Sequence, residues 1–333
     1  MRIVTNWCPD PLRKFLGSNG VRVTVIKTLS LLDMLSEKGL DCDLYYFARF
    51  VPPLVDRGLV RIGKVSMPII YGFHSPLKID YTVRPYHKLY NVVMPLQAMR
   101  ASVLSRRLHL LNLDDLKLAF RMGLASKSVY LLLGTNTEVF KPTPKNQEFT
   151  VIYASRASWN KGTDILVTSI VPQLVKKAPS IRIVIVGYGF LIHLYEGLKR
   201  YRNVYIIPYL PLSEYARVLS SSHVLLFPSR YESYGLVVLD ALACGTIPVA
   251  FNVRGFVRDI LSKDPILKRF VVEYPKVGSL VSRVIELYNI WLRNPQLFAF
   301  LMNYSRRLAN KFSWVNVGKL WLSMFKEVLM KAQ

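Results

Sequence analysis

Two cations stand five residues apart in the second half of the chain, within residues 155–162 (SRASWNKG). The planar guanidinium of Arg156 can hold phosphate oxygens through paired N–H groups, and the ammonium of Lys161 adds a compact charge. Gly162 follows directly and allows the backbone to turn tightly. These residue types suit a pyrophosphate group, although in so basic a chain an arginine and a lysine in a loop are equally typical of a solvated surface.

Two carboxylates lie farther along, one in residues 228–236 (PSRYESYGL) and one shortly after them. Gly235 begins a predicted helix whose free N–H groups and dipole favour an anion. Glu232 precedes that helix and Asp240 lies on it. Carboxylates accept hydrogen bonds from sugar and ribose hydroxyls, and the helix-terminal amides suit the phosphates between them. Taken alone, Asp240 is also compatible with a cap or an ion pair on the helix surface.

A pair of glycines follows the apolar run at residues 181–186. Gly187 and Gly189 lie where the backbone approaches a ligand in a wound α/β sheet. A dinucleotide fingerprint needs a third glycine at position 192, where this chain has Ile192, and an acidic residue near 207–210, where it has none. The pattern therefore speaks against a nicotinamide-dependent dehydrogenase.

The elements that must position these residues alternate between short apolar runs and amphipathic stretches, the pattern of βα units around parallel sheets. In the first half we predict strands at 2–5, 44–47, 68–71 and 108–111, a loop ending in residues 17–20, a helix over 21–37, and a helix from Asn112 to Gly123. In the second half we predict strands at 149–153, 181–186, 204–207, 224–227 and 248–251, and helices at 163–177, 236–243 and 314–331. Residues 141–146 form a polar break that predicts an interdomain linker.

The motifs together resemble the retaining GT-B glycosyltransferases of family four, over nearly all of residues 130–330. Residues 232–245 (ESYGLVVLDALACG) resemble the family's E-x7-E segment, and residues 155–162 resemble its GR-x4-KG diphosphate loop. Residues 181–189 (IRIVIVGYG) are similar to its strand ending in VGxG. Residues 133–142 (LGTNTEVFKP) and 311–329 (KFSWVNVGKLWLSMFKEVL) resemble its interdomain segment and its C-terminal FSW motif with the helix that crosses back to the first domain.

The resemblance implies a role for each matching residue. Arg156 and Lys161 would hold the donor diphosphate, Glu232 the sugar near its 3-hydroxyl, and Asp240 the ribose hydroxyls. His74, in MPIIYGFHSP, resembles a histidine that faces the acceptor, so the catalytic residues we expect are Glu232 and His74. Further donor contacts are implied for the backbone of Ser233, Tyr234, Gly235 and Leu236, for Gly187 and Gly189 at the base and ribose, and for Gly17 and Gly20 in a glycine loop over the phosphates.

The chain departs from the family pattern at several of these positions. Asp240 stands where the family has glutamate, one methylene longer, and Ser155 and Pro208 stand where it usually has glycine. Asn136 replaces the usual aspartate, and the first domain is shorter than in the family. These differences bear on the identity of the donor more than on the class of reaction.

The fold implied by the resemblance is α/β and of the GT-B type, with two Rossmann-like doubly wound domains facing across a cleft. We expect an acceptor-side domain at residues 1–145, completed by a C-terminal helix at 316–333, and a nucleotide-sugar-binding domain at 146–315. The implied reaction retains anomeric configuration and uses no metal or other cofactor. Arg156, Lys161 and a helix N-terminus would neutralise the leaving diphosphate in place of a metal ion.

The net charge of +24 is spread over both halves of the chain and favours anionic partners. Residues 81–111 interleave basic side chains with tyrosines, valines and Met94, which suits a surface lying against anionic lipid and, equally, an ordinary basic surface. We therefore expect a lipid-linked or saccharide acceptor. The alternatives are a DNA-modifying transferase and a protein that binds a nucleotide sugar without catalysis. The basic residues in this stretch are Arg84, His87, Lys88, Arg100, Arg106 and Arg107.

The expected location is the cytoplasm, with peripheral attachment to the inner face of the membrane. No stretch reaches the roughly 18 uninterrupted apolar residues of a membrane span, and the first residues do not resemble a signal peptide. Cys8, Cys42 and Cys244 are widely separated and lack metal-ligand spacing, so we interpret them as reduced thiols.

Overall fold

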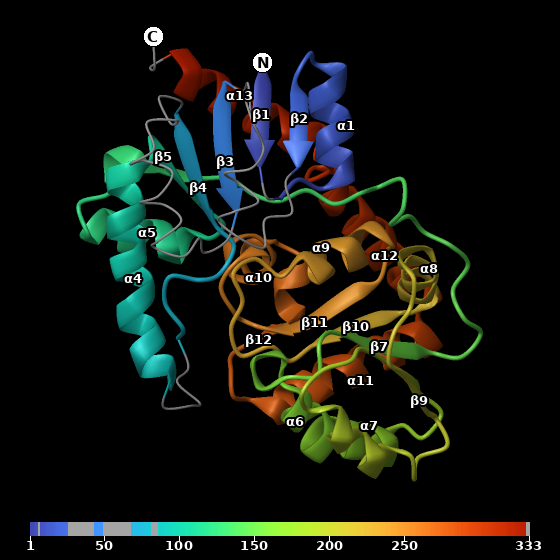
Figure 1. Cartoon of the computed structure of the whole chain (residues 1–333). Coiled ribbons are helices and arrows are strands. Elements are labelled where there is room, and N and C mark those ends of the chain that lie inside the picture. The colour runs from blue at the N-terminus through green and yellow to red at the C-terminus, as the bar shows by residue number, and fades with distance from the viewer. Residues whose placement is uncertain (6, 26–42, 49–67, 81–85, 331–333) are drawn as a thin grey trace. The chain divides into compact units, whose positions relative to one another are not determined.

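The chain forms two compact units in the computed structural model, which describes residues 1–5, 7–25, 43–48, 68–80 and 86–330 (Figure 1). Unit 1 comprises Met1–Gly134 together with Trp314–Gln333, and unit 2 comprises Thr135–Ser313. Each unit is built around its own six-stranded sheet, and all strand pairs in both sheets are parallel. The prediction of two wound α/β units is therefore confirmed.

The sheet of unit 1 has the strand order β2-β1-β3-β4-β5-β6. Its strands are short and apolar, and most of their side chains are buried, as expected for a parallel sheet with helices on its faces. The strands are β1 (Arg2–Thr5), β2 (Arg22–Val25), β3 (Leu44–Ala48), β4 (Ile69–Phe73), β5 (Arg107–Leu110) and β6 (Ser128–Tyr130). The helices are α1 (Asp10–Ser18), α4 (Tyr86–Leu104), α5 (Leu113–Arg121) and α13 (Trp314–Met330).

The first helix differs from the one expected. Helix α1 begins at Asp10, with a proline in its first turn, and it buries Leu12 and Leu16. Gly17 lies inside α1 and Gly20, at φ +74°, lies in the turn that leads to β2. The expected loop at residues 17–20 is therefore wrong at Gly17, which is helical. The start of the expected helix at 21–37 is wrong because the β-branched residues of β2 pair in register with β1. Residues 26–37 lie outside the described residues.

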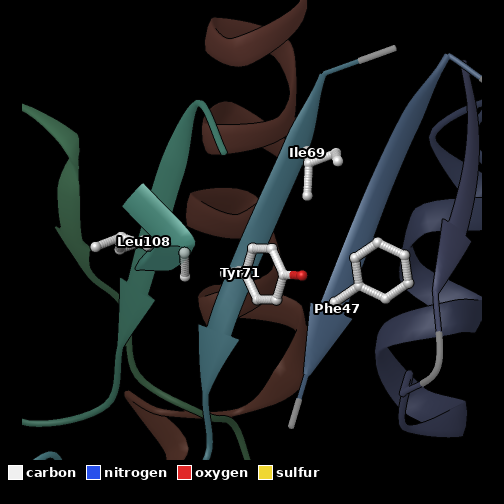
Figure 2. Close-up of a cluster of buried hydrophobic side chains, with 5 residues drawn as sticks. Phe47, Ile69, Tyr71 and Leu108 are labelled. Carbon is white, nitrogen blue, oxygen red and sulfur yellow. The ribbon is translucent and has the colours of Figure 1, made fainter. Parts of the chain in front are cut away.

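Helix α4 covers part of the sheet of unit 1 with its small residues. Ala101 packs on a buried cluster that β3, β4 and β5 contribute, shown in Figure 2. Ala98 packs in a second cluster with Leu110 of β5. Alanines at these positions let the helix lie close to the strands. The labelled side chains of the first cluster are Phe47, Ile69, Tyr71 and Leu108.

Helix α13 belongs to unit 1 although it comes last in the chain. Its Trp321 is fully buried, and the indole N–H donates to the carbonyl oxygen of Leu132 over 3.0 Å. Its Gly318 lies against the ring of Phe15 in α1, where a β-carbon would come within 2.6 Å of the ring. A bulky aromatic residue and a glycine thus fix α13 to unit 1.

The sheet of unit 2 has the order β12-β11-β10-β7-β8-β9, the doubly wound Rossmann arrangement. The chain winds outward from β7 in one direction, then returns to place β10 on the other side of β7. Strands β9 and β10 and helix α9 have the bounds predicted from sequence. The strands are β7 (Thr150–Ala154), β8 (Arg182–Val186), β9 (Val204–Ile207), β10 (Val224–Phe227), β11 (Ile247–Phe251) and β12 (Val271–Val272).

The helices of unit 2 flank this sheet. The helix predicted over 163–177 is continuous but changes type, with a π-helical segment at Leu166–Ile170 between α6 (Thr163–Ile165) and α7 (Val171–Lys177). No helix in the described part of the chain has the length and apolar character needed to cross a bilayer. The others are α8 (Leu212–Ser221), α9 (Leu236–Ala243), α10 (Phe256–Asp259), α11 (Val277–Arg293) and α12 (Pro295–Asn310).

The polar segment 141–146 lies in unit 2 and is anchored there by a buried lysine. The ammonium of Lys145 donates to the carbonyl oxygens of Ser220 and Ser222 over 2.8 and 2.5 Å and to Thr246 Oγ1 over 3.0 Å. Burial lowers the pKa of Lys145 to about 7. These oxygen acceptors include the last carbonyls of α8 and the turn after it, so the lysine caps that helix.

Candidate functional site

The loops after β7 and β10 meet at the point where the strand order of unit 2 reverses. Strands β7 and β10 are neighbours, with Val151 opposite Val224. The chain continues from β7 toward α6 and from β10 toward α9, on opposite sides of the point where the strand order reverses. In doubly wound sheets the carboxyl ends of two such strands form the crevice that binds ligands. The motifs carrying Arg156 and Lys161 follow β7, and those carrying Glu232 and Gly235 follow β10.

An ion pair joins these two loops. The Lys161 ammonium lies 2.5 Å from Oε1 of Glu232, and Ser229 Oγ donates to the same oxygen over 2.9 Å. The side chain of Glu232 is 8% exposed and that of Lys161 is 18% exposed. One carboxylate oxygen is therefore fixed by protein donors, and Oε2 can accept a hydroxyl of a bound sugar.

Arg230 connects the same two loops and was not among the residues singled out from sequence. Its guanidinium is 6% exposed and forms a bidentate pair with Asp164, at 2.7 and 2.6 Å. It also donates to the carbonyl oxygen of Trp159 over 2.5 Å, and its backbone N–H donates to that of Asn160 over 2.8 Å. The sequence gives little indication of this role, because Asp164 is 66 residues away and only the fold brings it to Arg230.

Arg156 points outward from the same loop. Its side chain is exposed, in contrast to those of Lys161 and Arg230. Gly162, at φ +72°, brings the end of this loop against the loop after β10, where a β-carbon would lie 2.1 Å from the carbonyl oxygen of Pro228. Only glycine allows this approach.

Gly187 and Gly189 pack against the loop that carries Arg156. A β-carbon on Gly187 would lie 1.8 Å from the carbonyl oxygen of Ser155, and one on Gly189 would lie 2.7 Å from that of Ala157. The N–H of Ala157 donates to the carbonyl oxygen of Tyr188 over 3.2 Å. The two glycines therefore hold the loops after β7 and β8 together, beside the region where a base and ribose are expected.

The backbone at residues 233–236 turns sharply into α9. Gly235 adopts φ +88° just before the helix, and Leu236 is 37% exposed at its first position. Tyr234 is buried, with its ring 5.9 Å from that of Phe256. Its side chain therefore anchors the turn. Ser233 lies in the loop before it, and the amides of Gly235 and Leu236 stand at the start of the helix, where an anion is favoured.

Asp240 lies inside unit 2 and not on the helix surface. It is 7% exposed, and Oδ1 accepts a hydrogen bond from Thr135 Oγ1 over 2.6 Å. Burial raises the pKa of Asp240 to about 7, and the hydrogen bond from Thr135 acts in the opposite direction. The carboxyl group is therefore poised between its neutral and ionised forms near neutral pH.

Exposed aromatic side chains follow β8 and β9, the two strands on one side of β7 in the sheet. Tyr188 and Phe190 are 67% and 82% exposed after β8, and Tyr209 is 77% exposed two residues after β9. Exposed aromatic faces can stack on a nucleobase. These residues were not predicted, although aromatic residues directly after two sheet strands are a readable signal.

His74 lies in unit 1, after β4, at the start of a hydrogen-bonded chain. Its Nε2 is 3.1 Å from Tyr46 Oη, which lies 2.7 Å from Nδ1 of the fully buried His109. His109 Nε2 lies 2.8 Å from the carbonyl oxygen of Leu131, and burial lowers the pKa of His109 to about 4. Gly72 makes room for the tyrosine, since a β-carbon there would lie 2.2 Å from its hydroxyl.

This chain of hydrogen bonds assigns the proton of each ring. Neutral His109 must carry its proton on Nε2 to donate to Leu131, so its Nδ1 accepts from the hydroxyl of Tyr46. That hydroxyl has no second proton, so it accepts from Nε2 of His74. In neutral His74, Nδ1 is then the basic nitrogen. Trp7 lies edge-on to the His74 ring at 4.4 Å.

The residues that the structure describes include no group of three His, Cys, Asp or Glu side chains placed to hold a metal ion. Cys8 and Cys244 are free thiols, and Cys42 lies outside the described residues.

Comparison with known proteins shows which families and folds this chain is similar to. Residues 135–297 match the family model described as Glycosyl transferases group 1. A phosphatidylinositol N-acetylglucosaminyltransferase subunit from Arabidopsis thaliana is 26% identical over 208 residues, 60% of this chain and 44% of that protein. The Homo sapiens protein of the same name is 27% identical over 283 residues, 78% of this chain and 55% of that protein. The chain thus spans about half the length of these relatives.

Solved structures share the fold at low sequence identity. Sucrose-phosphate synthase from Thermosynechococcus elongatus superposes with a TM-score of 0.77 at 15% identity, over 99% of both chains. S. aureus TarM, in a complex that contains UDP, gives a TM-score of 0.66 at 16% identity over 85% of this chain and 55% of that one. The chain therefore has the GT-B fold, and its residues 135–297 are similar to the glycosyl transferases group 1 family.

Proposed function

We propose that the chain transfers a sugar from a nucleoside-diphosphate sugar to a lipid-linked or saccharide acceptor, with retention of anomeric configuration and without a metal ion. The observation that carries the proposal is the meeting of Arg156, Lys161, Glu232 and the start of α9 at the reversal point of the unit 2 sheet. The two cations and the helix N-terminus suit the diphosphate of a nucleotide sugar, and the carboxylate of Glu232 suits the hydroxyls of its sugar.

Each group has a chemical task in this proposal. Arg156 and Lys161 hold the diphosphate and stabilise the negative charge that develops as the sugar leaves, together with the amides that begin α9. Glu232 accepts a sugar hydroxyl. Asp240 and the aromatic residues after β8 and β9 hold the ribose and the base. In the proposed reaction the acceptor hydroxyl attacks the same face of the sugar that the diphosphate leaves, and an oxygen of the leaving phosphate takes the hydroxyl proton, so that the anomeric configuration is retained.

The proposed acceptor carries a lipid. Support comes from relatives named for transfer of N-acetylglucosamine to phosphatidylinositol and from the excess of basic residues, which suits an anionic bilayer surface. The proposed location is accordingly the cytoplasmic face of a membrane, with peripheral attachment. His74, in unit 1, would act on the acceptor side.

The test is release of nucleoside diphosphate from a panel of UDP- and GDP-sugars, with extracted phospholipid or oligosaccharide as the acceptor. We expect one donor to support acceptor-dependent release that survives EDTA. Glu232→Gln should abolish release while leaving binding of the free nucleotide largely intact, because the proposed contact of Glu232 is with the sugar.

Three other results would point elsewhere. Normal turnover by Glu232→Gln would remove the proposed site. Loss of activity in EDTA would overturn the metal-free reaction. Donor binding with no release for any acceptor would favour a non-catalytic nucleotide-sugar-binding protein, and release dependent on duplex DNA would favour a DNA-modifying transferase.

A further inference from the structure

The outward face of helix α4 is apolar. A surface helix ordinarily turns its polar residues to solvent, yet seven of the twenty exposed large apolar side chains in the described part of the chain lie on this helix of 19 residues. They recur three or four residues apart and so form one stripe. We call this stripe the α4 outer face: Tyr86, Leu89, Val92, Val93, Leu96, Met99 and Val103, which are 38–79% exposed.

The opposite side of α4 is fixed to unit 1, so the stripe cannot rotate inward. Asn91 accepts from the N–H of Ile79 over 2.6 Å and donates to its carbonyl oxygen over 3.0 Å. Tyr90 Oη donates to the carbonyl oxygen of Pro76 over 2.6 Å. At the other end, the ammonium of Lys127 donates to carbonyl oxygens of Ser102 and Ser105. These contacts and the buried alanines leave the large apolar residues facing outward.

The surroundings of the stripe are basic. Residues 81–111 contain five lysine or arginine residues and no aspartate or glutamate, and two of the five, Lys88 and Arg100, lie on the helix itself. Lys88 is exposed on α4, and Arg106 is exposed just after it. Arg107, which the sequence grouped with them, forms a salt bridge of 2.5 Å with Glu327, so it contributes less. Arg84 lies outside the described residues.

Exposed apolar side chains with a cation near each end of the helix, Lys88 and Arg106, suit the surface of an anionic bilayer, which is apolar inside and negatively charged outside. We propose that the α4 outer face inserts into the headgroup region of an anionic phospholipid bilayer, with Lys88 and Arg106 contacting lipid phosphates. A second copy of the chain fits less well, because joining two such faces would bring like charges together. The helix lies in the plane of the interface and does not span it.

This inference deepens the proposed function, on which it rests for the choice of a lipid surface. Binding to vesicles needs no turnover, however, and the two proposals can fail separately. Loss of vesicle binding with soluble-acceptor transfer intact would remove the docking face alone. Vesicle binding without transfer would remove the transferase alone.

The experiment is flotation of the full chain with vesicles of phosphatidylcholine, with and without phosphatidylglycerol. The wild type should float only with the anionic vesicles. The triple variant Leu89→Gln, Val92→Gln, Leu96→Gln should need at least about tenfold more lipid for half-maximal binding, because each loses buried apolar area at the interface. Lys88→Gln with Arg106→Gln should weaken binding at 0.1 M salt and match the wild type at 1 M, where the Debye length is only about 3 Å.

The matched control is a second triple variant, Leu292→Gln, Leu297→Gln, Phe300→Gln, on α11 and α12 of unit 2. Its residues are 38–53% exposed, so it removes a similar apolar area elsewhere. It should float like the wild type, and circular dichroism should show both triple variants folded. Equal flotation of the α4 variant and the wild type would overturn the proposal. So would a wild-type dimer that the α4 variant converts to a monomer, since a second copy would then cover the face.

Discussion

Lys161 Nζ lies 2.5 Å from Glu232 Oε1, so the cation expected to hold the donor diphosphate and the carboxylate expected to hold the donor sugar are partners in one ion pair. A phosphate that draws Lys161 toward itself also changes the surroundings of Glu232. The two residues therefore act as a unit, and their substitutions should not be additive.

Lys161→Ala should lower both donor affinity and stability. It leaves the buried Glu232 carboxylate without its cation, at a cost of about 1–3 kcal/mol, and the lost phosphate contact should weaken nucleoside diphosphate binding about ten- to a hundredfold. Adding Glu232→Gln should restore much of the stability but none of the affinity. Thermal denaturation and calorimetric titration of the single and double variants measure both. Additive losses of stability would show that the pair contributes nothing as a pair.

Arg156→Ala should weaken binding without affecting stability. The side chain is exposed, so its removal leaves no buried group unpaired, while a charge-assisted contact to phosphate is worth about 1.5–3 kcal/mol. Arg202→Ala is the control, because this exposed arginine precedes β9 at the opposite edge of the sheet. Equal affinities of the two variants for nucleoside diphosphate would make Arg156 an ordinary surface charge.

Donor binding should depend on pH through Asp240. Burial raises its pKa from 3.8 to about 7, so the folded chain binds an extra proton between these values. The stability that this proton contributes is fully present below about pH 4 and is lost as pH rises through about 7. The ionised carboxylate accepts ribose hydroxyls, so nucleotide affinity should rise over about pH 6–8.

Two substitutions separate this effect from other titrating groups. Asp240→Asn should flatten both pH profiles. Thr135→Val removes the hydroxyl that donates to Oδ1 and opposes the rise in pKa, so the affinity profile should move to higher pH. Affinity titrations of the three proteins at several pH values decide the matter, and a wild-type profile that is flat across neutral pH would count against the ribose role.

Tyr46→Phe should reduce transfer while leaving donor affinity unchanged. The substitution removes the hydroxyl that links His74 to His109 by hydrogen bonds, so the proton of His74 is no longer held on Nε2. We expect a fall in kcat of roughly tenfold or more, by analogy with the loss of an orienting partner of a catalytic histidine. The tautomer should change as well, which nitrogen NMR of the imidazole can measure. Tyr45→Phe, the neighbouring residue on β3, serves as the control, and an unchanged His74 spectrum in Tyr46→Phe would exclude the positioning role.

The fold of unit 2 could be read largely from sequence, because its strands are mostly buried and therefore continuously apolar. Val204–Ile207, Val224–Phe227 and Leu236–Ala243 were delimited correctly from apolar runs closed by glycine or polar residues. Unit 1 was harder. Gly17 and Gly20 indicated a loop, yet Gly17 lies in α1, where buried Leu12 and Leu16 outweigh the low helix propensity of glycine.

The residues of the candidate site could be predicted from their types and motifs, but the hydrogen-bond partners that hold them could not. Arg156, Lys161 and Glu232 stand in recognisable motifs, and the fold brings their loops together. Their partners carry no local signal. Tyr46 and His109 lie on separate strands and meet only because β3 and β5 flank β4, and Thr135 is 105 residues from the Asp240 that it contacts.

The contacts of Arg230 join the loop after β7 to the loop after β10, so that the two loops open together. Its guanidinium and its backbone amide both bond the segment Trp159–Lys161, so that segment cannot leave the sheet edge without releasing the loop after β10. Amide hydrogens in both loops should therefore exchange with solvent at rates set by a single opening free energy. A nucleotide that touches either loop should slow exchange in both by the same factor, and Arg230 should be the residue whose loss makes the two rates independent.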